Sequence, residues 1–257
     1  MDIYITNLKW SKERRLHMEK QLKGTKLTYQ FFDCVVGADL TDAEIAEKCD
    51  IENINKLNDN AGVEWFNRGI IGCTLTWQNM LRDMIAKDLD YMMLLEDDTI
   101  IPDNLFEILE FTQSQIRQGD MLLLYWKAWE PLQLTEPVIS TPFGFNYYIA
   151  ENYKVLTGGN AWIMTRQVAE RMLALNIPIH TTPDNYKYFF DHKAIDRLIC
   201  AYPHVVKAAN FKSTMHKGRF VFLRKVIDRY KIFPFYQYLN YQRNKNLNKA
   251  QEVVFIK

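Results

Sequence analysis

Three consecutive acidic residues, Glu96-Asp97-Asp98, follow directly on the apolar run DYMMLL at 90–95. In an extended strand the side chains of residues 96 and 98 share one face, and residue 97 points to the other. Two carboxylates on one face repel each other unless one is protonated or a cation lies between them. Oxygen ligands suit Mg²⁺ or Mn²⁺, which would in turn hold a diphosphate. We therefore predict a metal site at Glu96 and Asp98, against the alternative of a solvated acidic turn that caps the next helix.

A phosphatase of the haloacid-dehalogenase type uses similar ingredients, an apolar strand followed by DxDxT. Here Glu96 would occupy the nucleophile position, and Thr99 falls one residue early, so the sequence disfavours that interpretation. The sequence also has no GxGxxG after a strand, no GxxxxGK[ST] and no HExxH, which are the usual phosphate and zinc motifs.

Further candidates lie C-terminal to the acidic triplet. Gly158-Gly159 precedes the apolar run AWIMT, and indicates either a tight turn or a close approach of the backbone to a ligand. Gly159 and its neighbour Asn160 are accordingly candidate ligand contacts. Asp184 and Asp191 are candidate general bases, although both are equally compatible with ordinary surface acids.

One histidine and two tryptophans also have residue types suited to a site. His216 follows the last predicted strand and could reach a metal, but a single histidine is more often structural. Trp126 and Trp129 could stack on a sugar ring, and a pair of buried core tryptophans is the alternative.

The elements that must position these residues alternate between strands and helices. Apolar runs predict strands at 3–8, 29–36, 90–95, 121–126, 161–165 and 205–211. Helical spacing and capping signals predict helices after Ser11 and Thr41, over 73–87, after Pro102 and over 166–175, with an irregular segment at 50–68 and strand-like pieces within 130–150. This alternation predicts an α/β fold with a mostly parallel sheet, whose carboxyl edge is where such folds bind ligands.

Composition narrows the class of protein further. The 257 residues are 48% hydrophobic and 25% charged with a formal net charge of +1, which excludes a disordered chain and gives no global field to recruit nucleic acid. The four cysteines, Cys34, Cys49, Cys73 and Cys200, show no metal-ligand spacing and suit a reducing compartment. The N-terminus lacks the pattern of a signal peptide, and the longest apolar run, Met121–Trp126, is too short for a membrane helix. We therefore expect a cytoplasmic protein.

Charge is unevenly distributed, which divides the chain into a predicted body, 1–216, and a basic, aromatic tail, 217–257. The tail has ten Lys and Arg against two acids, a net +8, and leaves −7 on the body. Leu223, Val226, Ile227 and Tyr230 recur at helical spacing, and Pro234 ends that pattern. The tail is either a helix that lies on the anionic inner face of the cytoplasmic membrane or a helix docked on the body with a solvated basic face.

Five ordered segments resemble the family 25 glycosyltransferases, the lipooligosaccharide biosynthesis galactosyltransferases. YITNLKWSKERRLHMEKQL (4–22) is similar to the family's opening VINLDRSxxRRxxMxxQL, and GIIGCTLTW (69–77) to GEIGCxLSH. MLLEDDTIIPDNL (93–105) is similar to LVLEDDVxLPxDF, GGNAWIMTRQVAERML (158–173) to GTxAYxISRxGAxKLL, and Pro183-Asp184 to a short PxD element. The chain departs from the family at Ile70, where the family has Glu, and at Trp77, where it has His.

The resemblance implies a fold of the GT-A type and an inverting transfer, usually of galactose from UDP-galactose to a saccharide hydroxyl of a lipid-linked oligosaccharide. By position, it implies that Ile5, Asn7, Leu8 and Arg15 meet the nucleotide, together with Glu96 and Asp97 of the DxD-like element. It implies Asp98 as the better metal ligand, and places His216 roughly where such enzymes supply a late one.

Inversion in a single displacement requires a base on the far face of the sugar to take the acceptor proton. We assign that role to Asp184, with Asp191 in reserve, and assign Mn²⁺ or Mg²⁺ to the leaving diphosphate. The departures at Ile70 and Trp77 keep a second function open, a non-catalytic relative that binds nucleotide or sugar without transfer.

Overall fold

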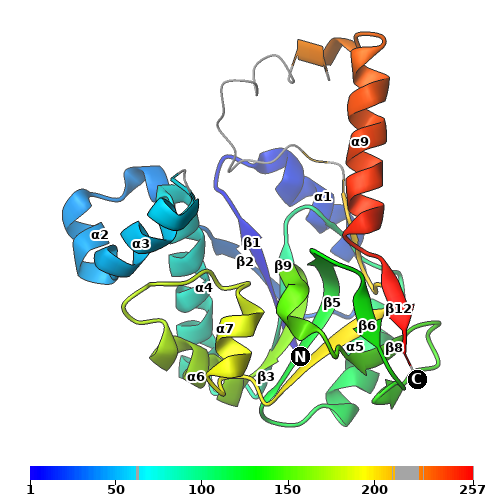
Figure 1. Ribbon diagram of the computed structural model, residues 1–257. Coiled ribbons are helices and arrows are strands. Elements are labelled where there is room, and N and C mark those ends of the chain that lie inside the picture. Colours follow the sequence, from blue (N-terminus) through cyan, green and yellow to red (C-terminus); the bar gives the residue numbers. More distant parts are fainter. Residues whose placement is uncertain (62–63, 210, 212–225, 228, 257) are drawn as a thin grey trace.

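The computed structural model describes residues 1–61, 64–209, 211, 226–227 and 229–256. Its centre is an eight-stranded sheet in the order β2-β1-β3-β9-β5-β10-β8-β7 (Figure 1). Six of these strands run in one direction, and β9 and β8 run in the other. The sheet strands are β1 Asp2–Asn7, β2 Tyr29–Asp33, β3 Tyr91–Glu96, β5 Asp120–Ala128, β7 Ile139–Ser140, β8 Asn146–Ile149, β9 Leu156–Thr165 and β10 Arg197–Tyr202.

Helices cover both faces of the sheet, which confirms the predicted α/β class. The helices are α1 Lys12–Leu22, α2 Asp42–Lys48, α3 Ile51–Ala61, α4 Arg68–Ala86, α5 Leu105–Gln115, α6 Arg166–Leu175, α7 Tyr186–Asp191 and α9 Phe235–Lys249, with single 3-10 turns at η1 Gly37–Asp39 and η2 Tyr153–Val155. Two small two-stranded sheets add β4 Thr99–Ile100 with β11 Lys207–Ala208, and β6 Leu132–Leu134 with β12 Val253–Phe255.

Strand β3 is apolar on both faces because both faces are covered. Met92 and Leu94 belong to a core with α4, and Met93 and Leu95 belong to the opposite core with α1 and α5. All four side chains are fully buried. The strand that carries the acidic triplet is therefore held rigidly in the middle of the molecule.

Several predicted elements form as expected. Helix α6 covers the predicted 166–175, and Thr41 makes the predicted capping box with Glu44. Ser11 is the N-cap of α1, although its side chain makes no capping hydrogen bond.

Other elements correct the prediction. The segment predicted as irregular at 50–68 contains α3, whose asparagines obscure its apolar stripe and of which Ile54 is the buried residue. The sequence did not reveal β10, and the strand predicted at 205–211 is reduced to β11, which pairs with β4 outside the central sheet.

The C-terminal segment returns to the body of the protein. Residues 223–225 and 228 of the predicted tail helix lie outside the described residues, and α9 begins immediately after Pro234, where the apolar pattern was expected to end. Helix α9 is mostly polar, so its weak periodicity provided no signal. Beyond it, β12 pairs in parallel with β6, so the end of the chain is attached to the sheet region.

Candidate functional site

The acidic triplet lies where β1, β3 and β9 meet at one edge of the sheet. Thr6 of β1 pairs with Glu96 of β3, and Leu95 pairs with Ala161 of β9. Asn7, at the end of β1, and Asn160, beside Ala161, are therefore brought to the same edge as Glu96. The carboxyl ends of the parallel strands lie at this edge, which is where open α/β sheets bind ligands.

Glu96 and Asp98 converge on one amide, as their shared face predicts. The Asn160 side chain donates from Nδ2 to Glu96 Oε2 at 3.1 Å and to Asp98 Oδ1 at 3.2 Å. Both carboxylates are half-buried. Two acid groups thus face each other across a single neutral donor, which separates their charges without neutralising them.

Asp97 points the other way and is used internally. Its Oδ2 accepts a hydrogen bond of 2.7 Å from Asn7 Nδ2, and its Oδ1 accepts one of 2.7 Å from Arg14 Nη1. The side chain of Asp97 is 9% exposed and that of Arg14 13% exposed. Asp97 therefore joins β1, α1 and β3, and its carboxylate is occupied by protein partners rather than turned toward a nucleotide.

Arg14 also contacts the outward-facing acid. Its Nη1 lies 3.1 Å from Asp98 Oδ2, and its guanidinium lies 5.4 Å from the ring centre of Phe211. The cation that the acidic triplet requires is supplied in part by the first turn of α1. The sequence pointed to Arg15 at this place, but Arg15 pairs with Glu19 at 2.9 Å and stacks over Phe31 on the helix surface.

The crowding of carboxylates alters their acidity. Burial, followed by the charges of Asp98 and Asp97, raises the pKa of Glu96 to about 7, while Lys127 acts in the opposite direction. Burial also raises the pKa of Asp98, and Arg14 opposes that rise. Lys127, on β5, is a second nearby cation, and no motif in the sequence pointed to it.

Asp184 lies close to this group. Its Oδ2 accepts hydrogen bonds from Thr157 Oγ1 at 3.2 Å and from the Gly158 backbone at 3.3 Å, and its charge acts on Glu96. The Tyr186 hydroxyl donates to the Gly158 carbonyl at 2.6 Å. The loop before α7 is therefore fastened to the start of β9, with Asp184 at the junction.

Gly158 and Gly159 each have a local reason to be glycine. Gly158 has a φ of +89°, which other residues rarely adopt. A Cβ on Gly159 would lie 3.2 Å from Cζ2 of Trp77, so its close approach is to a protein ring. Trp77 in turn lies 4.4 Å from Trp162, ring centre to ring centre. The tryptophan that replaces the family's histidine is thus a buried packing residue.

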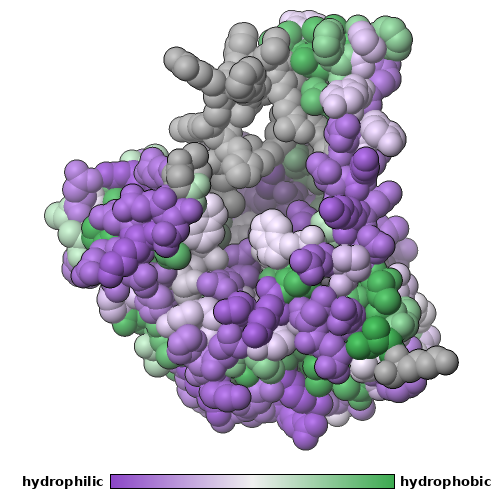
Figure 2. All heavy atoms as spheres, in the orientation of Figure 1, coloured by the Kyte–Doolittle hydropathy of each residue, from purple (hydrophilic) through white to green (hydrophobic). Residues whose placement is uncertain are grey.

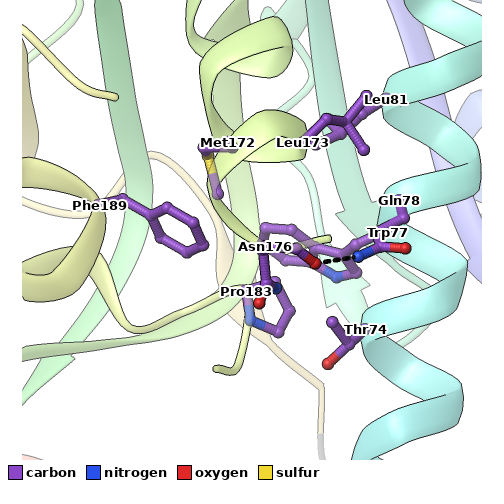
Figure 3. A pocket seen from close by; sticks show the side chains of 9 residues that line it. All are labelled: Thr74, Trp77, Gln78, Leu81, Met172, Leu173, Asn176, Pro183 and Phe189. Atoms are coloured by element: carbon purple, nitrogen blue, oxygen red, sulfur yellow. Dashed lines mark hydrogen bonds between the residues drawn. The ribbon is translucent and has the colours of Figure 1, made fainter. Parts of the chain in front are cut away.

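Figure 3 shows the small gap beside Trp77, between α4 and α6. Gln78 donates from Nε2 to the Asn176 carbonyl at 2.6 Å across it, and Met172 and Phe189 close its other side. Its volume of about 10 Å³ leaves no room for a ligand. The gap is therefore a packing feature of the core and no part of the site.

The remaining predicted residues are dispersed. Ile5 is fully buried in the core, so its side chain has no surface for a nucleotide, whereas Leu8, at the end of β1, is half-buried near the edge. Asp191 bonds to the Tyr153 hydroxyl at 2.5 Å and lies 3.4 Å from Lys187 on the surface of α7. His216 lies outside the described residues.

The two tryptophans predicted as a pair have separate fates. Trp126 is fully buried and donates from Nε1 to the Ala201 carbonyl at 3.0 Å, which makes it a core residue. Trp129 is 72% exposed. The arrangement is neither a shared stacking platform nor a buried pair.

The donor set fits a divalent cation in part. Among the described residues, no cluster of three or more His, Cys, Asp or Glu is arranged to hold a metal. Mg²⁺ is commonly held by one or two carboxylates, with substrate phosphates and water as its other ligands. Glu96 and Asp98, which converge on Asn160, match that smaller requirement.

Two thiols lie within reach of the same charges. Burial raises the pKa of Cys34 and of Cys73 to about 12, with the neighbouring acids, including Glu96, adding to the effect. Both thiols are therefore protonated at neutral pH and serve as packing residues rather than nucleophiles.

Arg14 and Arg15 offer a matched test of this geometry. We expect Arg14→Ala to lower the free energy of unfolding by about 3 kcal/mol, because it leaves the Asp97 carboxylate buried without its cation. Arg15→Ala removes an exposed pair and should cost less than about 1 kcal/mol. Urea denaturation of both variants measures the difference, and equal losses would contradict the internal role of Asp97.

The raised pKa of Glu96 predicts a pH-dependent stability. The folded state holds a proton on Glu96 that the unfolded chain releases above its ordinary pKa of 4.5, so stability should fall as pH rises from about 4.5 to about 7. The loss attributable to Glu96 is roughly 3 kcal/mol. Urea titrations in metal chelator at pH 5 and pH 8 should show it in the parent protein and not in Glu96→Gln. Glu13→Gln, an exposed change on α1, serves as the control, and identical pH profiles for Glu96→Gln and the parent would refute the assignment.

Comparisons with known proteins add three solved structures of weak similarity. A glycosyltransferase involved in the glycosylation of the major capsid of PBCV-1 has a TM-score of 0.34 and 11% identity over 77% of this chain and 80% of that one. A197 from STIV has a TM-score of 0.34 and 10% identity over 85% and 98%. Mannose-1-phosphate geranyltransferase from Thermus thermophilus has a TM-score of 0.34 and 9% identity over 77% and 72%.

Similarities of that size carry no conclusion about activity, and no curated protein matches the sequence. The family model of glycosyltransferase family 25, described as LPS biosynthesis protein, matches residues 1–187, which include the acidic triplet, Asn7, Asn160 and Asp184. This chain belongs to glycosyltransferase family 25, the glycosyltransferases of lipopolysaccharide biosynthesis.

Proposed function

We propose that this chain is an inverting glycosyltransferase that transfers a hexose, galactose from UDP-galactose, to a hydroxyl of a lipid-linked lipooligosaccharide. The observation that carries the proposal is the placement of Asp184 beside the Glu96 and Asp98 pair, fixed through Thr157 and Gly158. Family membership supports a glycosyltransferase. The donor sugar, the inverting course and the metal belong to the proposal.

The nucleotide side of the site lies at β1 and α1. Asn7 and Arg14 hold Asp97, which fixes the turn that presents Asp98. A divalent ion, Mn²⁺ or Mg²⁺, held by Glu96 and Asp98 would stabilise the negative charge that develops on the leaving diphosphate. Asn160 orients both carboxylates toward that position.

The acceptor side lies at β9 and β5. Both observed hydrogen bonds to Asp184 reach the same oxygen, Oδ2, and orient its carboxylate. A base so oriented can take the proton from an acceptor hydroxyl as that hydroxyl attacks the anomeric carbon. Lys127, whose positive charge acts on Glu96, helps to balance the negative charge of the group.

The reaction test compares Asp98→Asn, Asp184→Asn and Asp191→Asn. We expect Asp98→Asn to abolish the Mn²⁺-dependent thermal stabilisation by UDP-galactose and the transfer. Asp184→Asn should keep donor stabilisation but lose transfer to lipooligosaccharide by at least about a hundredfold, the usual contribution of a general base. The measurements are thermal unfolding with and without Mn²⁺ and incorporation of labelled galactose.

The outcomes also separate the alternatives. Intact transfer in Asp184→Asn with loss in Asp191→Asn would move the base to Asp191. Donor binding by the parent protein without transfer or hydrolysis would identify a non-catalytic relative. A different UDP-sugar as the strongest stabiliser would replace galactose.

We also propose that the C-terminal segment contacts the anionic inner leaflet, where the lipid-linked acceptor lies. Among the described residues, the structure has no helix with the length and apolar character needed to cross a bilayer. Figure 2 shows hydrophobic residues gathered at the free end of α9, where Ile232, Phe233 and Phe235 are 38%, 75% and 58% exposed. Arg229 and Lys231 flank them, which suits an anionic surface.

Vesicle flotation tests this contact. Phe233→Ser combined with Phe235→Ser should weaken binding to phosphatidylglycerol-containing vesicles by at least about tenfold, because two buried aromatic rings are lost from the interface. Trp129→Ser removes an equally exposed ring elsewhere and is the control. Failure of the parent protein to float would leave a helix docked on the body as the explanation.

A further inference from the structure

A second pocket lies in the C-terminal half of the sheet, away from the acidic triplet. Its volume is about 270 Å³, and its walls come from β8, β10, the turn before β8 and the returning strand β12. The residues that shape it are Thr141, Phe145, Asn146, Tyr148, Tyr202 and Phe255. Its size is near the lower end of the range for small-molecule sites.

The pocket opens at the same edge of the sheet as the acidic triplet. Leu95 of β3 pairs with Ala161 of β9, and Ala161 pairs with Tyr125 of β5. On the other side of β5, Tyr202 of β10 pairs with Asn146 of β8, at the carboxyl end of β10. From β3 to β8 there are four strand steps of about 4.8 Å each, so the pocket lies roughly 19 Å from Glu96. An oligosaccharide of several residues covers that span.

The lining chemistry is neutral and mixed. Within the described part of the chain, no charged side chain lines the pocket, although the chain as a whole is 25% charged. Phe255 forms an edge-on pair with Tyr148 at 5.8 Å and with Tyr202 at 6.0 Å between ring centres. Asn146 and Thr141 place an amide and a hydroxyl beside these rings, joined by a hydrogen bond of 2.9 Å from the Thr141 backbone to Asn146 Oδ1. Aromatic faces together with neutral hydrogen-bonding groups match the apolar face and the hydroxyls of an uncharged sugar.

The end of the chain completes the pocket. Phe255 is 58% exposed, and its strand is held by the pairing of β12 with β6. Four residues earlier, Gln251 donates from Nε2 to the Tyr125 hydroxyl at 3.1 Å. Tyr125 in turn lies near the acidic triplet, because Asp98 and Glu96 act on the pKa of its hydroxyl, which burial raises. The segment from Gln251 to Phe255 therefore runs between the reaction centre and the pocket.

We infer that this pocket is a distal acceptor subsite, which binds a neutral sugar residue of the acceptor oligosaccharide several units away from the hydroxyl that reacts. The inference rests on the proposed transfer function for its role, but its sugar binding is independent of transfer. The donor occupies the β1 and β3 side, and the acceptor extends from Asp184 across β5 toward β10 and β8. The C-terminal strand then contributes to acceptor recognition.

Three variants of the full chain test the subsite. Phe255→Ala removes the ring, Phe255→Tyr keeps it, and Tyr238→Ala removes a similarly exposed ring from α9, outside the pocket (61% exposed against 58%). Saturation-transfer NMR with galactose, glucose and N-acetylglucosamine as probes measures sugar binding without donor. We expect at least one probe to bind the parent protein, Phe255→Tyr and Tyr238→Ala, and to bind Phe255→Ala about three- to tenfold more weakly.

Transfer kinetics provide the second readout. Phe255→Ala should lower kcat/KM for an intact lipooligosaccharide acceptor by about three- to tenfold, and leave kcat/KM for a monosaccharide acceptor and the rate of donor hydrolysis unchanged. Equal binding of every probe by Phe255→Ala and Tyr238→Ala, or no binding to the parent protein, would overturn the subsite. Probe binding that depends on Phe255 in a protein that transfers nothing would keep the pocket and reject the proposed activity.

Discussion

The site depends on one constraint, the placement of three carboxylates at the end of a buried strand. Strand β3 is fixed by core packing on both faces, so Glu96, Asp97 and Asp98 cannot move apart to relieve their repulsion. Their charges must be balanced where they stand. The alternation of the strand divides the task, because it turns one acid inward and two outward.

Each acid receives a different kind of partner. Asp97 is neutralised within the protein by Arg14 and Asn7, which ties the acidic turn to the first strand and helix. Glu96 and Asp98 share the amide of Asn160 on their common face. The raised pKa of Glu96 shows that this pair is incompletely compensated. An edge of this kind has a favourable position for a cation that arrives with a diphosphate.

The sheet also gives the site a direction. The nucleotide side lies toward β1, and Asp184 stands toward β9 and β5, on the side from which the C-terminal strand returns. Strand β12 brings Phe255 beside Tyr202, and α9 carries exposed aromatic side chains away from the body (Figure 1). The C-terminal segment is thus joined to the body at β12, and the exposed aromatic residues Phe233 and Phe235 lie at the opposite end of α9.

Local patterns were sufficient to predict much of the fold and part of the site. The apolar run before Glu96 predicted a buried strand, the Thr41 and Glu44 spacing predicted a capping box, and strand alternation placed residues 96 and 98 on one face. These features depend on neighbours in the sequence, so the sequence specifies them directly. The asparagine-rich α3 and the polar α9 were missed because polar side chains interrupt their apolar pattern.

What the sequence could not decide was which distant residues meet. It offered Arg14 and Arg15 side by side, and only the angle at which α1 packs against β3 selects Arg14 for Asp97. It left Trp126 and Trp129 as a pair, and the pairing of β5 with its neighbours buries the first and leaves the second exposed. Sequence alone determined that carboxylates would crowd the end of a strand. Tertiary structure decided which partners compensate them, because those contacts join residues far apart in the chain, and no local pattern encodes them.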